Sequence, residues 1–280
     1  MHTTPDCDPH WSGAKPFGIL GAIKGEWTIM ATVGVAAVER ALSILDAFTD
    51  QDPQLSLAEV AKRTNMYKST VLRLARSLEN YGYLVRAEDG MYRLGSKLLK
   101  LGSLYQRHFH TADHVPATLR AIVDDLNEGA SFYVRDGDRR LCLHRVDALR
   151  SVRDSIHEGD RLPLNVGAAG HVIRAFGGSS GGNYEKVRTE MYAASFGERD
   201  PEVAAIACPV FGLNQRLAGA LNVSGPLYRI EALGVHAILR VLLKHAVRLT
   251  NGFGGDPSAL AAALGAIEQK ARPKRVARVR

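Results

Sequence analysis

Apolar residues between positions 36 and 81 recur every three or four residues, the spacing that puts side chains on one face of an α-helix. The pattern predicts three helices, over residues 36–49, 56–63 and 68–81. The sequence SLAE, beginning at Ser56, is a capping box at the start of the second helix. Gly82 follows the third helix, and glycine commonly ends a helix because it accepts a left-handed backbone.

The third predicted helix has two unlike faces. On a helical wheel, one side gathers the apolar residues Val71, Leu74, Ala75 and Leu78, and the opposite side gathers Ser69, Arg73, Arg76 and Asn80, with Lys68 and Thr70 near the start. The apolar side needs a core to pack on. The other side offers long cations, hydroxyls and an amide, which suit phosphate oxygens and base edges. An ordinary solvated face explains this helix alone equally well.

Two short runs of alternating apolar and polar residues follow, on either side of Asp89-Gly90, and predict a β-hairpin. The order of helix, helix, tight turn, helix and hairpin predicts a winged helix-turn-helix, in which the third helix enters the major groove of DNA. Arg73 and Arg76 then reach guanine or phosphate, and Arg86 and Arg93 on the hairpin reach the DNA backbone or minor groove.

The rest of the chain predicts a linker helix and an α+β domain. Residues 96–110 place Leu98, Leu101 and Tyr105 on one side of a helix, which fits a dimer contact. Four alternating segments predict antiparallel strands, and 234–251 predicts an apolar helix. The small residues of PLNVGAAGHVIRAF predict a turn into a helix with backbone N–H groups open to an anion; a tight turn for close packing is the alternative. Such a domain can enclose a small ligand.

The net positive charge of the chain is concentrated in a few segments rather than spread along it. The chain of 280 residues has a net charge of +7, but the tail at 272–280 carries five cations, and the remainder is only +2. Residues 60–78 carry five cations and no acid, the pattern expected of a face that attracts phosphate: Lys62, Arg63, Lys68, Arg73 and Arg76.

The cysteines exclude some classes of protein. Cys7, Cys142 and Cys208 are odd in number and lack a CxxC spacing, which argues against a disulfide scaffold or a zinc site and fits the reducing cytoplasm. No apolar run reaches the length of a membrane span. We expect no cofactor.

Two groups of residues allow other readings. A metal reading of His108, His110, Asp113 and His114 is weak, since their spacing matches no tight site. An enzyme reading needs Cys208 as a nucleophile with His144 or His171 as base, and a strand cysteine is more often an inert apolar residue.

Several separated motifs, in order over residues 36–253, resemble the IclR family of bacterial transcriptional regulators. VERALSILDAF, LSLAEVAKRTNMYKSTVLRLARSLENYGYLVR and YRLGSKLLKLGSLY resemble its winged-helix domain and linker. GDRLPLNVGAAGHVI and ERDPEVAAIACPVFGLNQRLAGALNVSGPLYRI resemble its GAF-like effector domain. The resemblance implies a homodimer or tetramer that binds a palindromic operator on double-stranded DNA and responds to a small-molecule effector, often an organic or aromatic acid.

The resemblance also implies site residues. DNA contacts fall on Lys68, Ser69, Thr70, Arg73, Arg76 and Arg93. Effector contacts fall on Ala168 and Ala169 of the NVGAAGH turn, on Asn222 and Ser224 of the LNVSGP strand, and on Ser195. The family more often has Ser at Asn222 and an acid at Ser195. Between Phe176 and Tyr192, a Gly/Ser loop replaces the family's helical cover of the pocket, so the alternative is a DNA-binding regulator that has lost effector sensing.

The expected organisation has five parts. They are a disordered N-terminal extension at 1–35 (of which 1–29 precede a second candidate start, Met30), a winged helix-turn-helix at 36–95, a linker helix at 96–111, a GAF-like effector domain at 112–253 and a basic tail at 254–280.

Overall fold

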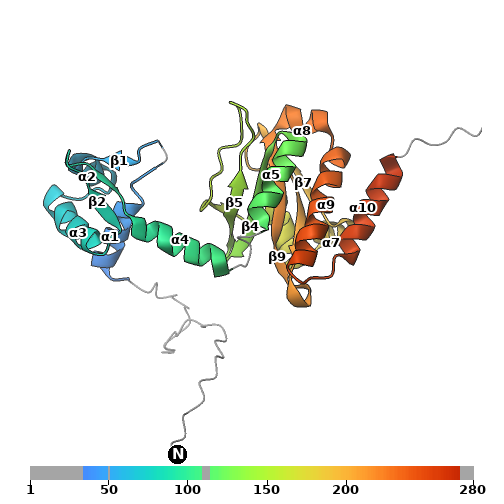
Figure 1. Cartoon of the computed structure of the whole chain (residues 1–280), viewed down its shortest axis with the longest axis horizontal. Coiled ribbons are helices and arrows are strands. Elements are labelled where there is room, and N and C mark those ends of the chain that lie inside the picture. Colours follow the sequence, from blue (N-terminus) through green and yellow to red (C-terminus); the bar gives the residue numbers. More distant parts are fainter. Residues whose placement is uncertain (1–33, 50, 109–113, 272–280) are drawn as a thin grey trace, which may run out of the picture. The chain divides into compact units, whose positions relative to one another are not determined.

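The computed structural model describes residues 34–49, 51–108 and 114–271. These residues form two compact units, which divide between Leu94 and Gly95 (Figure 1). The N-terminal extension (apart from residues 34 and 35) and the last nine residues of the basic tail lie outside the described residues.

The first unit is a winged helix-turn-helix. Its helices are α1 (Ala36–Leu45), α2 (Leu57–Arg63) and α3 (Lys68–Asn80), and its small antiparallel sheet has the order β1-β3-β2, with β1 at Gln54–Leu55, β2 at Leu84–Arg86 and β3 at Tyr92–Leu94. One apolar core joins the three helices to the sheet. Its fully buried side chains include Ile44, Leu55, Val60, Val71 and Tyr92.

Local chemistry determines where these helices begin and end. The Oγ of Ser56 accepts the N–H of Glu59, and the Glu59 carboxylate accepts the N–H of Ser56 at 2.7 Å, so the predicted capping box is confirmed. Asn65 (φ +52°) turns the chain from α2 to α3, and Gly82 (φ +76°) turns it after α3.

Two details of this unit differ from the prediction. Helix α1 ends at Leu45 rather than at 49, and two of the apolar residues that recur along it, Val38 and Leu42, are more than half exposed. The segment between the first two predicted helices contains the strand β1, whose Gln54 pairs with Arg93. With two residues, this strand is too short to show alternation.

The second unit begins with helix α4 (Ser96–His108) and is organised around a six-stranded antiparallel sheet of order β6-β5-β4-β9-β8-β7. The strands are β4 (Gly129–Asp136), β5 (Arg139–Val146), β6 (Arg161–Pro163), β7 (Ala193–Phe196), β8 (Val203–Phe211) and β9 (Leu217–Pro226). The four predicted strands correspond to β4, β5, β8 and β9. Strands β6 and β7 have three and four residues, and the sequence analysis missed them.

Helices cover both faces of this sheet (Figure 1). On one face, α5 (Val115–Leu126), α8 (Leu227–Leu233), α9 (Val235–Gly252) and α10 (Ser258–Ala271) form the larger apolar cluster. On the other face, α6 (Ala168–Phe176) and α7 (Gly182–Glu190) form a smaller cluster. Alternation along β9 separates the faces, since Leu221 and Val223 join the larger cluster and Ala220 the smaller one.

Two segments of this unit contradict the sequence analysis. Residues 182–190, expected in a Gly/Ser loop, form α7, which buries Val187. Arg188 of this helix donates to the carbonyl oxygen of Ala175 in α6 and to that of Ser179, which follows α6. Residues 258–271, expected in a basic tail, form α10, which buries Leu260 and Ile267 against α9. Within the described residues, no helix has both the length and the apolar character needed to cross a membrane.

Candidate functional site

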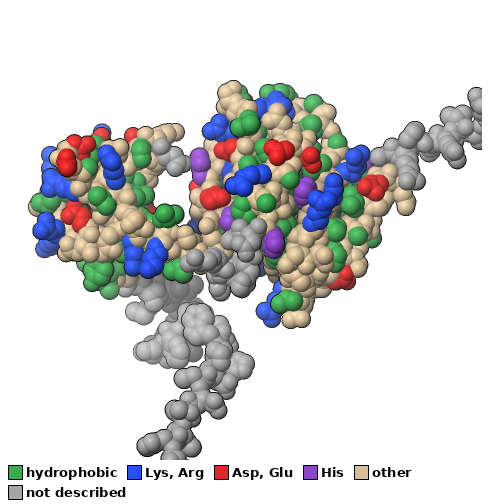
Figure 2. Space-filling view, in the orientation of Figure 1, with side chains coloured by type: hydrophobic (Ala, Val, Ile, Leu, Met, Phe, Trp, Pro, Cys, Tyr) green, Lys and Arg blue, Asp and Glu red, His purple; other side chains and the backbone are tan. Residues whose placement is uncertain are grey.

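The outer face of α3 is exposed and cationic. Its apolar side buries Val71, Ala75 and Leu78 in the core. The opposite side leaves Lys68, Ser69, Arg73 and Arg76 exposed and Thr70 half-buried. Among the described residues, no ion pair or hydrogen bond engages the side chain of Arg73 or Arg76, so both guanidinium groups are free to meet another molecule. Lys and Arg side chains lie along the outer edge of this unit, beside α3 (Figure 2).

A shallow groove runs between α3 and the hairpin. It is lined by Ser69, Leu72, Arg73, Arg76, Ser77, Glu79, Arg86 and Tyr92. The Arg86 guanidinium lies over the ring of Tyr92, 5.7 Å from its centroid. Cations from α3 and β2 therefore line one concave surface, an arrangement that can hold a phosphate backbone.

Two other arginines of this unit have protein partners. Arg63 forms an ion pair with Asp52 (2.7 Å) and donates to the Ala47 carbonyl (2.9 Å), so it connects α2 to the end of α1 rather than belonging to the predicted cationic face. The hydrogen bond from Arg63 lowers the pKa of the Asp52 carboxyl. Arg93 is exposed, and its Nη2 donates to Gln54 Oε1 at 2.9 Å, which orients it beside the sheet.

The second unit contains a small cavity of about 30 Å³ between the sheet and α6. All five predicted effector residues line it: Ala168, Ala169, Ser195, Asn222 and Ser224. The other lining residues are Tyr133, Arg140, Asp154, Leu162, Gly167, Arg199, Val203 and Ala205. Polar and apolar residues therefore share this wall, and its apolar residues are small or aliphatic.

Strand register brings the polar residues together. Ser195 of β7 pairs with Ala205 of β8, and Ala205 pairs with Ser224 of β9, so the three lie in one row across the sheet. Asn222 lies two residues from Ser224 and faces the same side. The side chains of Ser195, Asn222 and Ser224 are almost fully buried. The predicted alternation along LNVSGP accounts for this placement.

Arg140 is a cavity residue that the sequence analysis missed. It is buried, its Nη1 donates to the carbonyl oxygens of Pro163 and Val166, and its guanidinium lies 5.5 Å from the ring centroid of Tyr133. Burial lowers the pKa of the guanidinium. Its Nε is buried, and no described group accepts its proton. Since Arg140 lies two residues before the buried Cys142, strand alternation could have placed it on the inner face.

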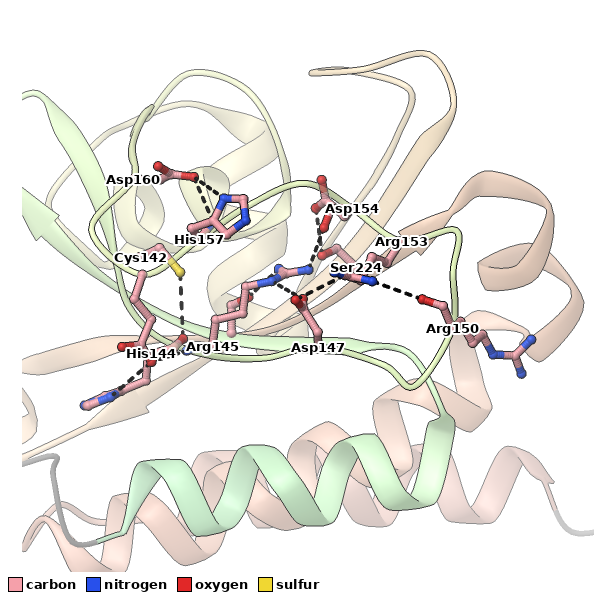
Figure 3. Close-up of polar contacts among 12 residues, drawn as sticks. Cys142, His144, Arg145, Asp147, Arg150, Arg153, Asp154, His157, Asp160 and Ser224 are labelled. Atoms are coloured by element: carbon pink, nitrogen blue, oxygen red, sulfur yellow. Dashed lines mark hydrogen bonds and ion pairs between the residues drawn. The ribbon is translucent and has the colours of Figure 1, made fainter. Parts of the chain in front are cut away.

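Asp154 was also missed, because it comes from a loop with no pattern. It is 6% exposed; its Oδ1 accepts Arg199 Nη2 at 2.6 Å, and its Oδ2 accepts the Ser224 hydroxyl at 3.0 Å. Arg145 fixes this loop by donating to the Asp154 carbonyl (3.0 Å) and to Asp147 Oδ1 (2.7 Å). Figure 3 shows Asp154 turned toward Ser224 and Arg145 beside Asp147.

The turn before α6 needs small residues. Gly167 has φ +81°, and a Cβ on Gly170 would lie 2.6 Å from the Leu164 carbonyl oxygen, so larger residues do not fit. The Gly167 N–H donates to Glu198 Oε2 (2.9 Å), which also contacts His171 Nε2 (2.7 Å). Within the described residues, the N–H groups of Ala168 and Ala169 have no hydrogen-bond acceptor. The turn therefore combines close packing at Gly170 with backbone N–H donors, at Ala168 and Ala169, that have no acceptor among the described residues.

The metal and enzyme readings gain no support. Among the described residues, no three His, Cys, Asp or Glu side chains gather as metal ligands, and His110 and Asp113 lie outside them. Cys208 is fully buried in the larger apolar cluster, whereas His171 is on α6 at the opposite face of the sheet. Burial raises the pKa of the Cys208 thiol, which opposes a thiolate nucleophile.

Comparison with known proteins agrees with this architecture. Residues 37–88 match the profile described as the IclR helix-turn-helix domain, and residues 182–251 match the bacterial transcriptional regulator IclR C-terminal profile. The transcriptional regulator KipR of Bacillus subtilis is 25% identical over 213 residues, which are 67% of this chain and 85% of KipR.

Solved structures show the same fold. The IclR of Thermotoga maritima aligns with a TM-score of 0.66 and 21% identity, over 78% of this chain and 98% of its own. An IclR homologue from Microbacterium hydrocarbonoxydans, solved in complex with 4-hydroxybenzoate, aligns with a TM-score of 0.61 and 19% identity, over 82% of this chain and all of its own. From its paired helix-turn-helix and C-terminal domains and its relatives, the chain belongs to the IclR family of bacterial transcriptional regulators, which are DNA-binding proteins and not enzymes.

Proposed function

We propose that this regulator binds a small organic acid in the cavity between the sheet and α6, and that the acid changes its affinity for a palindromic operator. The cavity carries the proposal, because one buried site joins all five predicted effector residues to a buried arginine with an unused donor. Buried donors without acceptors are costly, and an anionic ligand would satisfy them.

The chemistry of the cavity favours an acid. Arg140 and Arg199 supply two positive charges, and Asp154 supplies one negative charge. The N–H groups of Ala168 and Ala169 stand at the start of α6, where the helix dipole also favours an anion. A ligand carboxylate placed here would receive these N–H groups, while Ser195 and Asn222 would hydrogen-bond the rest of the molecule. The complex of the Microbacterium homologue with 4-hydroxybenzoate supports an acidic ligand.

The α3 face is the proposed DNA contact. Ser69, Thr70, Arg73 and Arg76 would enter the major groove, and Lys68 and Arg93 would contact phosphates. Each guanidinium that reaches a guanine edge would discriminate between bases by about 1–3 kcal/mol. Since a palindrome needs two such faces, the working form would be a homodimer or a tetramer.

Exposed apolar side chains offer a dimer contact. Val38 and Leu42 of α1 and Leu99 and Leu104 of α4 are between 48% and 76% exposed. Exposed apolar side chains on each of these two helices suit contacts with a second copy of the chain.

The alternative function is a regulator without effector sensing. Its support was the Gly/Ser loop expected between Phe176 and Tyr192. Helix α7 occupies residues 182–190 instead and packs on α6, so that support is lost.

Calorimetry tests the proposal. Acetate, pyruvate, benzoate and 4-hydroxybenzoate are titrated into the wild type and into Asn222→Leu, with the exposed-turn variant Arg216→Ala as control. We expect at least one acid to bind the wild type and the control equally and to bind Asn222→Leu at least tenfold more weakly. The bound acid should also shift footprints on the DNA upstream of the protein's own gene. No heat with any acid would favour the regulator without sensing.

A further inference from the structure

Beside the inner cavity described above lies a second, wider depression, which we call the outer cavity. Its volume is about 470 Å³. Its lining has an apolar part, which includes Leu227 and Tyr228, and a charged part with more acids than cations. The apolar residues are Val152, Pro201, Val203, Pro226, Leu227 and Tyr228, and the charged residues are Arg153, Asp154, Asp200, Glu202 and Glu231. The two cavities share two lining residues, Asp154 and Val203, so one thin wall separates them.

An ion pair between two loops closes this wall. The loop after β5 contributes Asp154, whose neighbours Arg153 and Ser155 face the outer cavity. The loop between β7 and β8 contributes Arg199, which lines the inner cavity. Arg199 Nη2 and Asp154 Oδ1 are 2.6 Å apart, and the side chain of Asp154 is only 4% exposed, compared with 26% for Arg199.

The loop that carries Arg199 is held at its other side as well. Glu198 Oε2 accepts the N–H of Gly167 and contacts His171, both at the start of α6. Consecutive residues therefore attach this loop to both walls of the inner cavity, Glu198 to α6 and Arg199 to Asp154. Gly197, with φ +71°, precedes them and gives the loop a glycine turn at its base.

We propose that the Asp154–Arg199 ion pair is a partition that restricts the inner cavity to short acids, and that opening it joins the two cavities into a longer site. The inference rests on the proposed function and adds that the partition limits the length of the acid that the inner cavity accepts. With the partition closed, the donors at Ala168, Ala169 and Arg140 face a space that ends at Asp154. With the partition open, an acid keeps its carboxylate at α6 and extends an apolar tail toward Leu227 and Tyr228.

The partition can be opened without leaving a buried charge unpaired. Arg199→Ala alone would strand the Asp154 carboxylate with only Ser224 as partner, which destabilises a folded protein. The double variant Asp154→Asn/Arg199→Ala removes both charges and retains a side-chain oxygen for Ser224. Val203→Ala trims the other shared residue of the wall and leaves the ion pair intact.

The test compares two short acids, acetate and pyruvate, with 5-phenylvalerate, by calorimetry on the full chain. We expect the wild type and Arg216→Ala to bind whichever short acid binds more tightly with at least tenfold higher affinity than 5-phenylvalerate. In the double variant this preference should fall at least tenfold because 5-phenylvalerate gains affinity, and Val203→Ala should shift it in the same direction. Adding Tyr228→Ala to the double variant should remove part of the gain.

Each other outcome decides against the inference. If the double variant and Val203→Ala still bind the short acids and prefer them over 5-phenylvalerate as strongly as the wild type does, the ion pair is not a partition. The proposed function is then unaffected. A wild type that binds 5-phenylvalerate as tightly as the short acids overturns it too. If neither the wild type nor the variants bind any acid, the proposed function fails and the partition fails with it.

Discussion

Arg73 stands at the middle of the exposed α3 face, one helical turn from Ser69 and from Arg76. We predict that Arg73→Ala weakens specific operator binding by about 5- to 150-fold, because a base contact worth about 1–3 kcal/mol disappears. The fold should be unaffected, since the side chain is exposed and makes no contact that holds the unit together. A gel shift on the footprinted operator measures the loss, and a melting curve checks the fold.

Arg216→Ala is the matched control for charge, because Arg216 is an exposed arginine in the turn between β8 and β9 of the other unit. Removing it should leave operator affinity unchanged. Equal affinities of the wild type and Arg73→Ala would contradict the assignment of α3 as the recognition element.

Residues in regular elements were predictable from the sequence, and residues in loops were not. Asn222 and Ser224 follow from alternation along one strand, and the Ala168-Ala169 pair follows from a small-residue turn that resembles a family motif. Asp154 and Arg199 come from irregular loops, where no period fixes the direction of a side chain. Only the folded chain brings these two within 2.6 Å.

At the scale of the element, the capping box of α2 makes a sharp prediction. Ser56→Ala should lower the free energy of unfolding of the first unit by about 1 kcal/mol, because the N–H of Glu59 loses its acceptor at the helix start. Helix α2 supports α3 through Val60 and Ala61 in the shared core, so operator binding should weaken at physiological temperature. Thermal unfolding followed by circular dichroism measures the change.

Ser56→Thr keeps a hydroxyl at the cap and should retain most of the stability. If Ser56→Ala has the melting temperature of the wild type while Ser56→Thr has a lower one, the capping hydrogen bond does not stabilise α2 and this account of the helix is wrong.

The strength of the local pattern separates the elements that were predicted from those that were missed. Helices α2 and α3 and strands β4, β5, β8 and β9 are long enough, or well enough capped, to show a period. Helix α7 begins among glycines, and Val187 is the one buried side chain among those described in it. Its sequence therefore resembles a loop until α6 supplies the surface on which it packs. Tertiary contacts, not propensity, form this helix.

At the scale of the whole molecule, the resemblance predicted a winged helix-turn-helix followed by a larger α+β part, and the two compact units have these folds. The end of the second part was not predictable in this way. Helix α10 lies beyond residue 251, where the C-terminal profile ends, and packs on α9. A resemblance describes what relatives share, so a helix outside it has to be found by structure.

Acid stability is a property of the whole second unit, and Glu158 connects several of its elements. Its carboxylate accepts the Arg145 N–H at 2.9 Å, receives Gln106 of α4 at 3.4 Å, and lies 3.8 Å from His144 Nδ1. These contacts, the hydrogen bond with His144 first, lower the pKa of Glu158 below its ordinary value. A lowered carboxyl pKa stabilises the fold above the ordinary glutamate pKa of 4.5, and this stabilisation is lost as pH falls through the lower folded value.

We therefore predict that Glu158→Gln lowers the melting temperature by about 1–3 °C at pH 7, a small effect because the side chain is 46% exposed and partly screened by water. The gap between variant and wild type should narrow as pH falls below about 4.5, because the wild type then loses the same charge. Melting curves from pH 7 to pH 3 measure it, with Glu231→Gln as a control on an exposed carboxylate of α8. A gap that stays constant or widens toward acid pH would show that the Glu158 charge does not stabilise the junction of α4 with β5.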